Sequence, residues 1–334
     1  MANISGTLDN DVLLGTPERD VIAALAGDDV VQAGAGNDTV NGGPGDDLLF
    51  GNRGIDALFG AGGDDGIVWD NGDGSDTIDG GPGRDTATVH GALVAGETFE
   101  VGPGGTGGVL FERTSANPFQ LDIADVEVLE VQEFAGNGTL RVGDLLETPL
   151  RLVIFSGGAG NDTLDGSRAT TGLVARGGEG ADRLLGGAAD DVFLGHTGGD
   201  LLRGGGGGDQ LIGGVLDAGR DALRGGAGDD FLYPGPGDDQ LTGGPGRDVV
   251  LIEPGDGNDR MTDFTSGQDV IALRDFEGAA GAPLTFADLE DSIGTDAQGN
   301  VVIDLAPFAP VPSTSNTLTL LGVADVAEAD FALI

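Results

Sequence analysis

Aspartate recurs along much of this chain at a spacing of nine residues, in most units after a glycine-rich turn such as residues 42–47, Gly-Gly-Pro-Gly-Asp-Asp. The first series resumes after one two-residue insertion and comprises Asp11, Asp20, Asp29, Asp38, Asp47, Asp56, Asp65, Asp76 and Asp85. A second, less regular series comprises Asp162, Asp182, Asp191, Asp200, Asp209, Asp221, Asp230, Asp239, Asp248 and Asp259. Carboxylates and backbone carbonyls on flexible turns form the hard, all-oxygen shell that suits Ca²⁺ better than Mg²⁺. The sequence therefore predicts multiple calcium ions, with these aspartates as ligands.

The remaining ligands are expected to be backbone carbonyls of the turns, which glycine can orient because it tolerates positive φ. The glycines concerned are Gly34, Gly36, Gly43, Gly45, Gly81, Gly83, Gly158, Gly160, Gly178, Gly180, Gly187, Gly205, Gly207, Gly226, Gly228, Gly244 and Gly246. Zinc does not fit, because it prefers His or Cys ligands and the chain has no Cys and only His90 and His196.

Two nine-residue units can close one coil of parallel strands, with one strand on each of two facing sheets. An aliphatic residue follows most of the aspartates two positions later, as Leu13 and Leu49 do, and we expect it to point inward. Residue i then stacks on residue i+18 at about 4.8 Å. One column would hold Asp11, Asp29, Asp47 and Asp65, and the other Asp20, Asp38 and Asp56. Like charges at that distance cost about 0.9 kcal/mol even in water, and an intervening cation would reverse the sign.

A metal-free β-solenoid, in which Asp and Gly only mark turns, is the alternative. It explains the inward aliphatic residues, but it gives no reason for two charged columns. The units resemble the repeats-in-toxin, or haemolysin-type, nonapeptide G-G-x-G-x-D-x-U-x. The resemblance implies a calcium-bound parallel β-roll and secretion by a type I secretion apparatus. The chain ends in an acidic residue and four apolar ones, Asp330 to Ile334, which resembles the uncleaved carboxy-terminal signal of such substrates.

The fold class is therefore expected to be all-β, a calcium-bound parallel β-roll (β-solenoid) in two arrays. We expect a first β-roll over 1–88, an intervening β-rich segment over 89–155, a second β-roll with its closing turn over 156–275, and a C-terminal cap with the secretion signal over 276–334. Within the cap, a short helix is expected over 286–293, with Thr285 and Asp288 as a capping box. Glu97 lies outside the series, and we expect its replacement to have little effect on calcium binding.

Several outward positions of the first array are apolar, which usually marks a buried contact. They read Val12, Leu14, Val30, Gln32, Leu48, Phe50, Gly66 and Val68, and we call them the apolar strip. Either residues 89–155 lie over this strip, or another molecule does. Self-association and a cell-surface partner both remain open.

Charge and composition exclude several classes of function. The chain has 57 acidic residues against 15 basic ones, all of them Arg, for a net charge of -42, which argues against a nucleic-acid partner. It has no apolar run long enough for a transmembrane segment. The absence of Cys excludes cysteine nucleophiles, and two distant His residues exclude His-based metal sites. No Ser has Gly at both minus two and plus two, so the serine nucleophile elbow is also missing, and we expect no enzymatic activity. The expected function is that of a secreted, extracellular or cell-surface calcium-binding protein serving adhesion, matrix or surface-layer assembly. The alternative is a calcium-dependent carrier or C-terminal module of a secreted enzyme or toxin whose catalytic part lies outside this chain.

Overall fold

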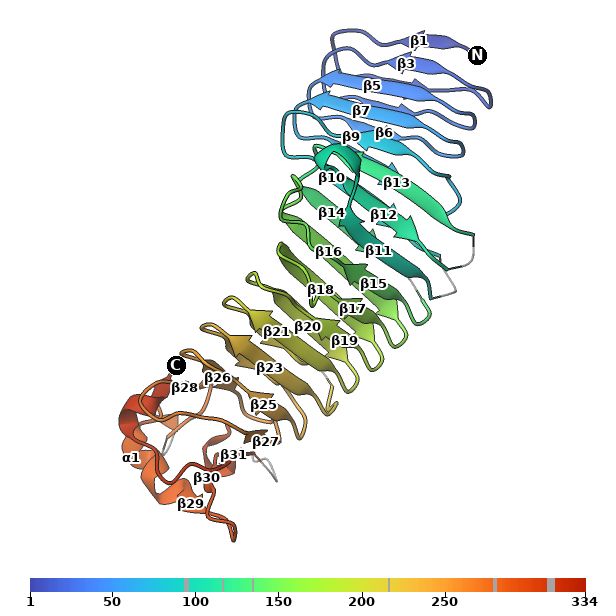
Figure 1. Cartoon of the computed structure of the whole chain (residues 1–334). Coiled ribbons are helices and arrows are strands. Elements are labelled where there is room, and N and C mark those ends of the chain that lie inside the picture. The colour runs from blue at the N-terminus through green and yellow to red at the C-terminus, as the bar shows by residue number, and fades with distance from the viewer. Residues whose placement is uncertain (93–95, 116, 134, 216, 279–280, 311–315) are drawn as a thin grey trace. The chain divides into compact units, whose positions relative to one another are not determined.

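Short parallel strands alternate between two sheets along nearly the whole chain. The computed structural model describes residues 1–92, 96–115, 117–133, 135–215, 217–278, 281–310 and 316–334 (Figure 1). These residues form two compact units, Met1–Ala159 with Thr163–Val174, and Gly160–Asp162 with Ala175–Ile334. In each unit, the two strands of one coil belong to two different sheets, here named sheet A and sheet B. The expected all-β parallel β-solenoid is therefore confirmed.

In the first unit, sheet A contains β1 (Asn3–Ser5), β3 (Val21–Ala23), β5 (Thr39–Pro44), β7 (Ala57–Gly62), β9 (Thr77–Asp79), β13 (Phe119–Ala124), β12 (Val109–Arg113), β11 (Thr98–Pro103), β15 (Thr139–Val142) and β17 (Thr163–Asp165). Sheet B contains β2 (Val12–Leu14), β4 (Val30–Gln32), β6 (Leu48–Phe50), β8 (Gly66–Trp69), β10 (Thr86–His90), β14 (Val128–Gln132) and β16 (Leu152–Ala159).

In the second unit, sheet A contains β19 (Arg183–Leu185), β21 (Leu201–Gly206), β23 (Ala222–Ala227), β25 (Gln240–Thr242), β27 (Asn258–Met261), β31 (Thr317–Leu320), β30 (Val301–Asp304) and β29 (Ile293–Thr295). Sheet B contains β20 (Val192–Thr197), β22 (Gln210–Ile212), β24 (Phe231–Tyr233), β26 (Val249–Ile252), β28 (Val270–Leu273) and β32 (Phe331–Leu333). Strand β18 (Gly172–Glu179) has residues in both units.

The register confirms the eighteen-residue turn. In sheet B, Val31 lies beside Leu49 and Leu49 beside Ile67. Their side chains are fully buried between the sheets, as are those of Ile22 and Val40 in sheet A. Because side chains alternate along a strand, the residues on either side of each inward aliphatic point outward. In these nonapeptide turns the core is one thin aliphatic layer per sheet, whereas Trp69, Phe99 and Phe111 add buried aromatic rings further along the first unit.

The segment that lacks the nine-residue series extends the sheets of the first unit. Strand β14 pairs in parallel with β10 and β16, which continues sheet B. Strands β11, β12 and β13 form an antiparallel meander within sheet A, in which β13 pairs in parallel with β9 and β11 pairs in parallel with β15. The first alternative for the apolar strip is therefore wrong, since these strands lengthen the sheets and leave it uncovered. Val12 and Leu14 remain 72% and 64% exposed.

The C-terminal segment also joins the solenoid. Strand β31 pairs with β27 and leads through β30 to β29, and β32 pairs with β28, so the C-terminal segment extends both sheets. The expected helix over 286–293 is shorter than the sequence suggested, because α1 (Phe286–Leu289) tightens into a 3₁₀ turn at Glu290–Ser292 and then enters β29. Its capping box is confirmed, with the Thr285 N–H donating to Asp288 at 2.9 Å. Among the described residues, no helix is long and apolar enough to span a membrane.

Stacked turns approach so closely that some glycines cannot carry a side chain. Gly45 has φ +134°, and a Cβ there would overlap the carbonyl oxygen of Gly27 in the preceding turn. At Gly62, a Cβ would meet no atom within 4 Å. We therefore expect Gly45→Ala to destabilise the folded state by at least about 2 kcal/mol, and Gly62→Ala to change it by less than about 0.5 kcal/mol. Denaturant unfolding in saturating calcium measures both, and equal losses would contradict the packing described.

Candidate metal centre

The aspartates of the nine-residue series form buried, hydrogen-bonded columns along the turns. Asp47 is typical: its Oδ1 accepts the backbone N–H of Asp29 at 2.8 Å, and its own N–H donates to Oδ1 of Asp65 at 2.8 Å. Asp47 is buried. Each carboxylate is thus fixed by the aspartate one turn earlier, and the i to i+18 stacking predicted from the spacing is confirmed.

Two such columns run through each unit. In the first unit they are Asp11, Asp29, Asp47, Asp65 and Asp85, and Asp20, Asp38, Asp56 and Asp76. In the second unit they are Asp162, Asp182, Asp200, Asp221, Asp239 and Asp259, and Asp191, Asp209, Asp230, Asp248 and Asp269. Insertions of two or three residues change the step without breaking the column, as between Asp56 and Asp76.

The second carboxylate oxygen carries the evidence for a ligand. Oδ2 is buried and accepts no hydrogen bond within the described part of the chain in Asp29, Asp38, Asp47, Asp56, Asp65, Asp85, Asp182, Asp200, Asp209, Asp230, Asp239, Asp248 and Asp259. Buried polar atoms in proteins almost always have partners, and an unpaired buried charge is very costly. A regular row of such oxygens therefore fits a row of cations.

Glycines keep the space beside these oxygens open. A Cβ at Gly42, five residues before Asp47, would clash with Oδ2 of Asp47. Carbonyl oxygens of the turns face the glycine of the next turn, so that a Cβ there would overlap them. Among the predicted carbonyl ligands, this holds for Gly36, Gly45, Gly160, Gly180, Gly187, Gly205, Gly207, Gly226 and Gly228. Within the described ranges, no three His, Asp or Glu side chains are grouped so that they could hold a metal ion.

The turn imposes its backbone geometry even where glycine is replaced. The position four residues before the aspartate has positive φ at Gly43, and also at Leu25, Ala61 and His196, with φ of 91°, 84° and 76°. Such values are unfavourable for residues with a Cβ. His196 thus occupies a turn position of the repeat.

Burial raises the pKa of many column aspartates in the inner turns. It raises the pKa of Asp47 to about 6 and the pKa values of Asp56 and Asp200 to about 7. The donated backbone N–H opposes this rise, and the neighbouring carboxylates of the same column add to it. A cation between the turns would favour the ionised form and so return these pKa values toward their ordinary range.

The sequence matches the RTX calcium-binding nonapeptide repeat (HemolysinCabind) over residues 5–40, 41–68, 70–88, 154–169, 175–214 and 217–250, more than half of the chain. The chain belongs to the RTX calcium-binding nonapeptide repeat family. RTX repeats are structural calcium-binding modules, so the ion that the family implies is Ca²⁺.

The other two comparisons, with curated proteins and with solved structures, add little to this family match. A search of curated proteins found none that is similar. Among solved structures, the extracellular lipase LipA from Serratia marcescens is similar at 17% identity with a TM-score of 0.28, over 99% of this chain. The chain spans 40% of the length of that lipase chain.

Terminal RTX units satisfy their aspartates internally. Thr16 replaces the glycine four residues before Asp20, and its N–H and hydroxyl both donate to Oδ2 of Asp20 at 2.7 Å. Thr7 contacts Asp11 in the same way, and the Thr265 N–H donates to Oδ2 of Asp269 at 2.7 Å. Asp11 and Asp20, although predicted as ligands, therefore fit a cation less well than the aspartates of inner turns.

Glutamates continue the columns where the RTX pattern is absent, and the nine-residue spacing could not reveal them. Oε2 of Glu127 accepts the N–H of Asp85 at 2.9 Å. Glu97, expected to be of little consequence, is buried and forms an ion pair with the buried Arg113. Arg113 also donates to the carbonyl of Asn117 at 2.9 Å. Here a guanidinium compensates the charge of a buried carboxylate.

A second ladder of hydrogen bonds, on the rim of the RTX turns, was also not predicted from the sequence. It uses the residue just before the column aspartate: the Asp46 N–H donates to Asp28 at 3.1 Å, and the Asp64 N–H to Asp46 at 2.8 Å. In this exposed ladder the later turn donates, whereas in the buried column the earlier turn donates. The acidic or Asn residue at that position was the available signal. Successive turns are thus joined in both directions.

The inner RTX sites can be tested at Asp47. Asp47→Ala should raise the calcium concentration needed for folding by roughly tenfold and lower its cooperativity, because it removes an oxygen shared by two turns. Asp122 is exposed on β13 and outside both columns, so Asp122→Ala is the matched control. Calcium titrations followed by circular dichroism give both midpoints. Equal shifts in the two variants would count against the assignment.

The raised pKa values determine how the stability of the folded, metal-free chain changes with pH. An aspartate in an unfolded chain has a pKa of about 3.9, below the values of about 6 and 7 for Asp47 and Asp56. The folded metal-free chain therefore binds more protons than the unfolded chain between about pH 4 and 7, and its stability falls as pH rises. In excess chelator, β-structure measured by circular dichroism should increase when the pH is lowered from about 7.5 to 5. A loss of β-structure over that interval would show that these carboxyls are not buried.

Proposed function

We propose that this chain is a secreted calcium-binding structural protein that folds on Ca²⁺ outside the cell and serves adhesion, matrix or surface-layer assembly. The observation that carries the proposal is the row of buried Oδ2 atoms without hydrogen-bond partners along the aspartate columns. Inner-turn aspartates such as Asp47 and Asp209 would hold the ions, together with turn carbonyls such as that of Gly45. Bound Ca²⁺ would supply the positive charge that makes stacked carboxylates attractive.

Calcium supply would control where the chain folds. Extracellular calcium modules bind at roughly 0.1 to 1 mM, far above cytosolic levels. Without the ion, a chain of net charge -42 and two charged columns stays expanded. An expanded chain is the form that a type I secretion apparatus would export.

The C-terminal residues support the secretion part of the proposal. Phe331–Leu333 form β32 beside β28, and Asp330 accepts hydrogen bonds from the Ser266 hydroxyl and the Gly267 N–H, both at 2.7 Å. A terminal signal made of these residues would be extended and unpaired in the unfolded chain and hydrogen-bonded beside β28 after folding. The chain would then be exported unfolded at low calcium and would function only after calcium had folded it.

The surface role rests on the apolar strip. Val12, Leu14 and Leu48 are exposed on sheet B, and Phe50 lies beside them, half-buried. Apolar area of about 400 Å² would contribute roughly 10 kcal/mol before the costs of association. We propose that a second copy covers the strip.

One titration tests the proposal. Far-UV circular dichroism should show little β-structure in excess chelator and a cooperative gain at roughly 0.1 to 1 mM calcium. Sedimentation of the folded sample should then show assemblies that Leu48→Asp with Phe50→Asp abolishes without loss of the β signal. A β spectrum that calcium does not change would overturn calcium-coupled folding. A folded wild type that stays monomeric would overturn self-association, and hydrolase activity of the chain would favour an enzyme or an enzyme module instead.

A further inference from the structure

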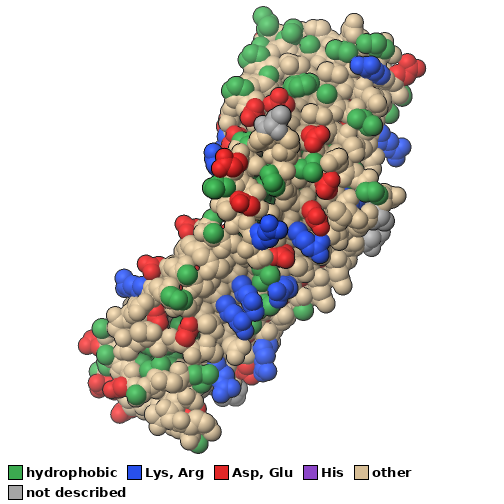
Figure 2. All heavy atoms as spheres, viewed as in Figure 1, with side chains coloured by type: hydrophobic (Ala, Val, Ile, Leu, Met, Phe, Trp, Pro, Cys, Tyr) green, Lys and Arg blue, Asp and Glu red, His purple; other side chains and the backbone are tan. Residues whose placement is uncertain are grey.

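The outward face of sheet A in the second unit is basic, in a chain that is otherwise strongly acidic. Across β19, β21, β23, β25 and β27, the outward neighbours of the buried residues Leu184, Leu202, Leu223, Leu241 and Met261 are Arg183, Leu185, Leu201, Arg203, Ala222, Arg224, Gln240, Thr242, Arg260 and Thr262. Four are arginines and none is acidic. Figure 2 shows arginine side chains gathered over the part of this face where Figure 1 places β19 and β23. We call Arg183, Arg203, Arg224 and Arg260 the arginine strip.

These arginines are available for an external partner. Arg183, Arg224 and Arg260 are exposed, and no member of the strip forms an ion pair with a carboxylate of the described residues. Nε of Arg203 is buried and has no hydrogen-bond partner among those residues. With 57 acids in the chain, a face on which four arginines go unpaired needs an explanation other than internal ion pairing.

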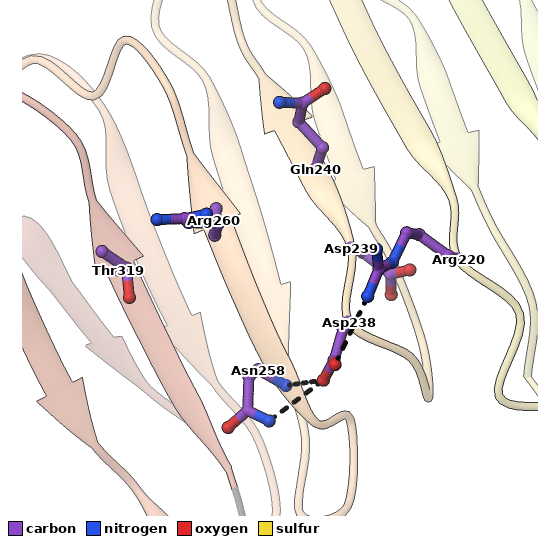
Figure 3. Close-up of a pocket in the computed structure, with 7 residues that line it drawn as sticks. All are labelled: Arg220, Asp238, Asp239, Gln240, Asn258, Arg260 and Thr319. Carbon is purple, nitrogen blue, oxygen red and sulfur yellow. Dashed lines mark hydrogen bonds and ion pairs between the residues drawn. The ribbon is translucent and has the colours of Figure 1, made fainter.

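The strip ends in a polar hollow of about 530 Å³. Figure 3 shows Gln240, Arg260 and Thr319 on one side of it, and Arg220, Asp238 and Asn258 on the other. Arg220 pairs with Asp238 at 3.6 Å, and the Asn258 side chain donates to Asp238 at 3.0 Å. Asp238 is therefore paired with neighbours on the rim of the hollow, while the exposed Arg260 forms no ion pair with a described carboxylate and lies near the Gln240 amide and the Thr319 hydroxyl.

We propose that the arginine strip binds an anionic polysaccharide, one extended chain bearing carboxylate or sulfate groups. Arginine forms bidentate hydrogen bonds with such groups, and Gln240, Thr242 and Thr262 can bond sugar hydroxyls. Strands about 4.8 Å apart put β19 and β27 about 19 Å from each other, and outward residues on one strand are about 6.6 Å apart. The strip is thus long and one chain wide. The inference deepens the proposed surface role by naming the class of its partner.

Other polyanions fit the strip less well. Duplex DNA is broader, with a major groove of about 12 Å and a minor groove of about 6 Å, and would extend over the acidic rim formed by Asp190, Asp229 and Asp238. Single-stranded nucleic acid uses aromatic stacking platforms, and none of the ten outward positions is aromatic. A membrane of anionic lipids would meet the same acidic rim.

Binding is measured with the full chain in saturating calcium, against hyaluronan for carboxylates, dextran sulfate for sulfates and neutral dextran as the blank. The wild type should bind one or both charged polymers and release them as salt is raised. Arg224→Gln with Arg260→Gln should weaken binding about tenfold. Arg19→Gln with Arg84→Gln removes the same charge from exposed turns of the first unit and should change the affinity less than twofold.

Circular dichroism of the same samples separates this inference from the proposed function. A chain that does not gain β-structure with calcium defeats the proposed function, whereas a folded chain that binds neither charged polymer above neutral dextran defeats only the arginine strip. Equal losses in the two double variants would also overturn it, because attraction would then follow total charge. Equal or tighter binding of single-stranded DNA or phosphatidylserine vesicles would assign the face to another class of partner.

Discussion

Parallel stacking sets one buried aspartate carboxylate over the next at every turn, and the repulsion between them is the constraint to which the other features respond. Backbone hydrogen bonds stabilise the columns in part, since each Oδ1 accepts an N–H from the neighbouring turn. That bond leaves the second oxygen buried and the charge uncompensated. With only a thin aliphatic layer between the sheets, the fold has little other free energy with which to offset this cost.

The chain meets the same constraint in three chemically different ways. Inner RTX turns leave Oδ2 open between glycines, in the manner expected of a site for Ca²⁺. End units use a threonine N–H and hydroxyl, as Thr16 does for Asp20, which closes the oxygen to an ion. The intervening segment uses the buried Arg113 against Glu97, with the guanidinium 4.8 Å from the ring centre of Phe119. In the last two arrangements a hydrogen-bond donor or a cationic group from the chain itself compensates the buried carboxylate.

Much of the solenoid could be predicted from the sequence because its interactions are periodic. A spacing of nine implies alternation between sheets, and an inward residue two positions after Asp47 implies Leu49 in the core. The antiparallel meander β11 to β13 was not predictable, because its pairing with β9 joins residues more than forty positions apart with no repeat to indicate the register. The places of Glu127 and Asp269 in the columns were not predicted either, because each residue completes a column from outside the regular nine-residue series. The arginine strip required the register of five strands, as its members are unevenly spaced in sequence.

The two ladders that join each turn to its neighbours also determine how such a gene can change in length. In-frame loss or duplication of eighteen codons leaves each remaining turn with an equivalent partner above and below, because contacts reach no further than the adjacent turn. Loss of nine codons would move every later strand to the opposite sheet and exchange the two columns. Two or three extra codons are absorbed in a loop, as between Asp200 and Asp221. A change in length by one whole turn thus preserves the stacking, whereas a change by half a turn does not.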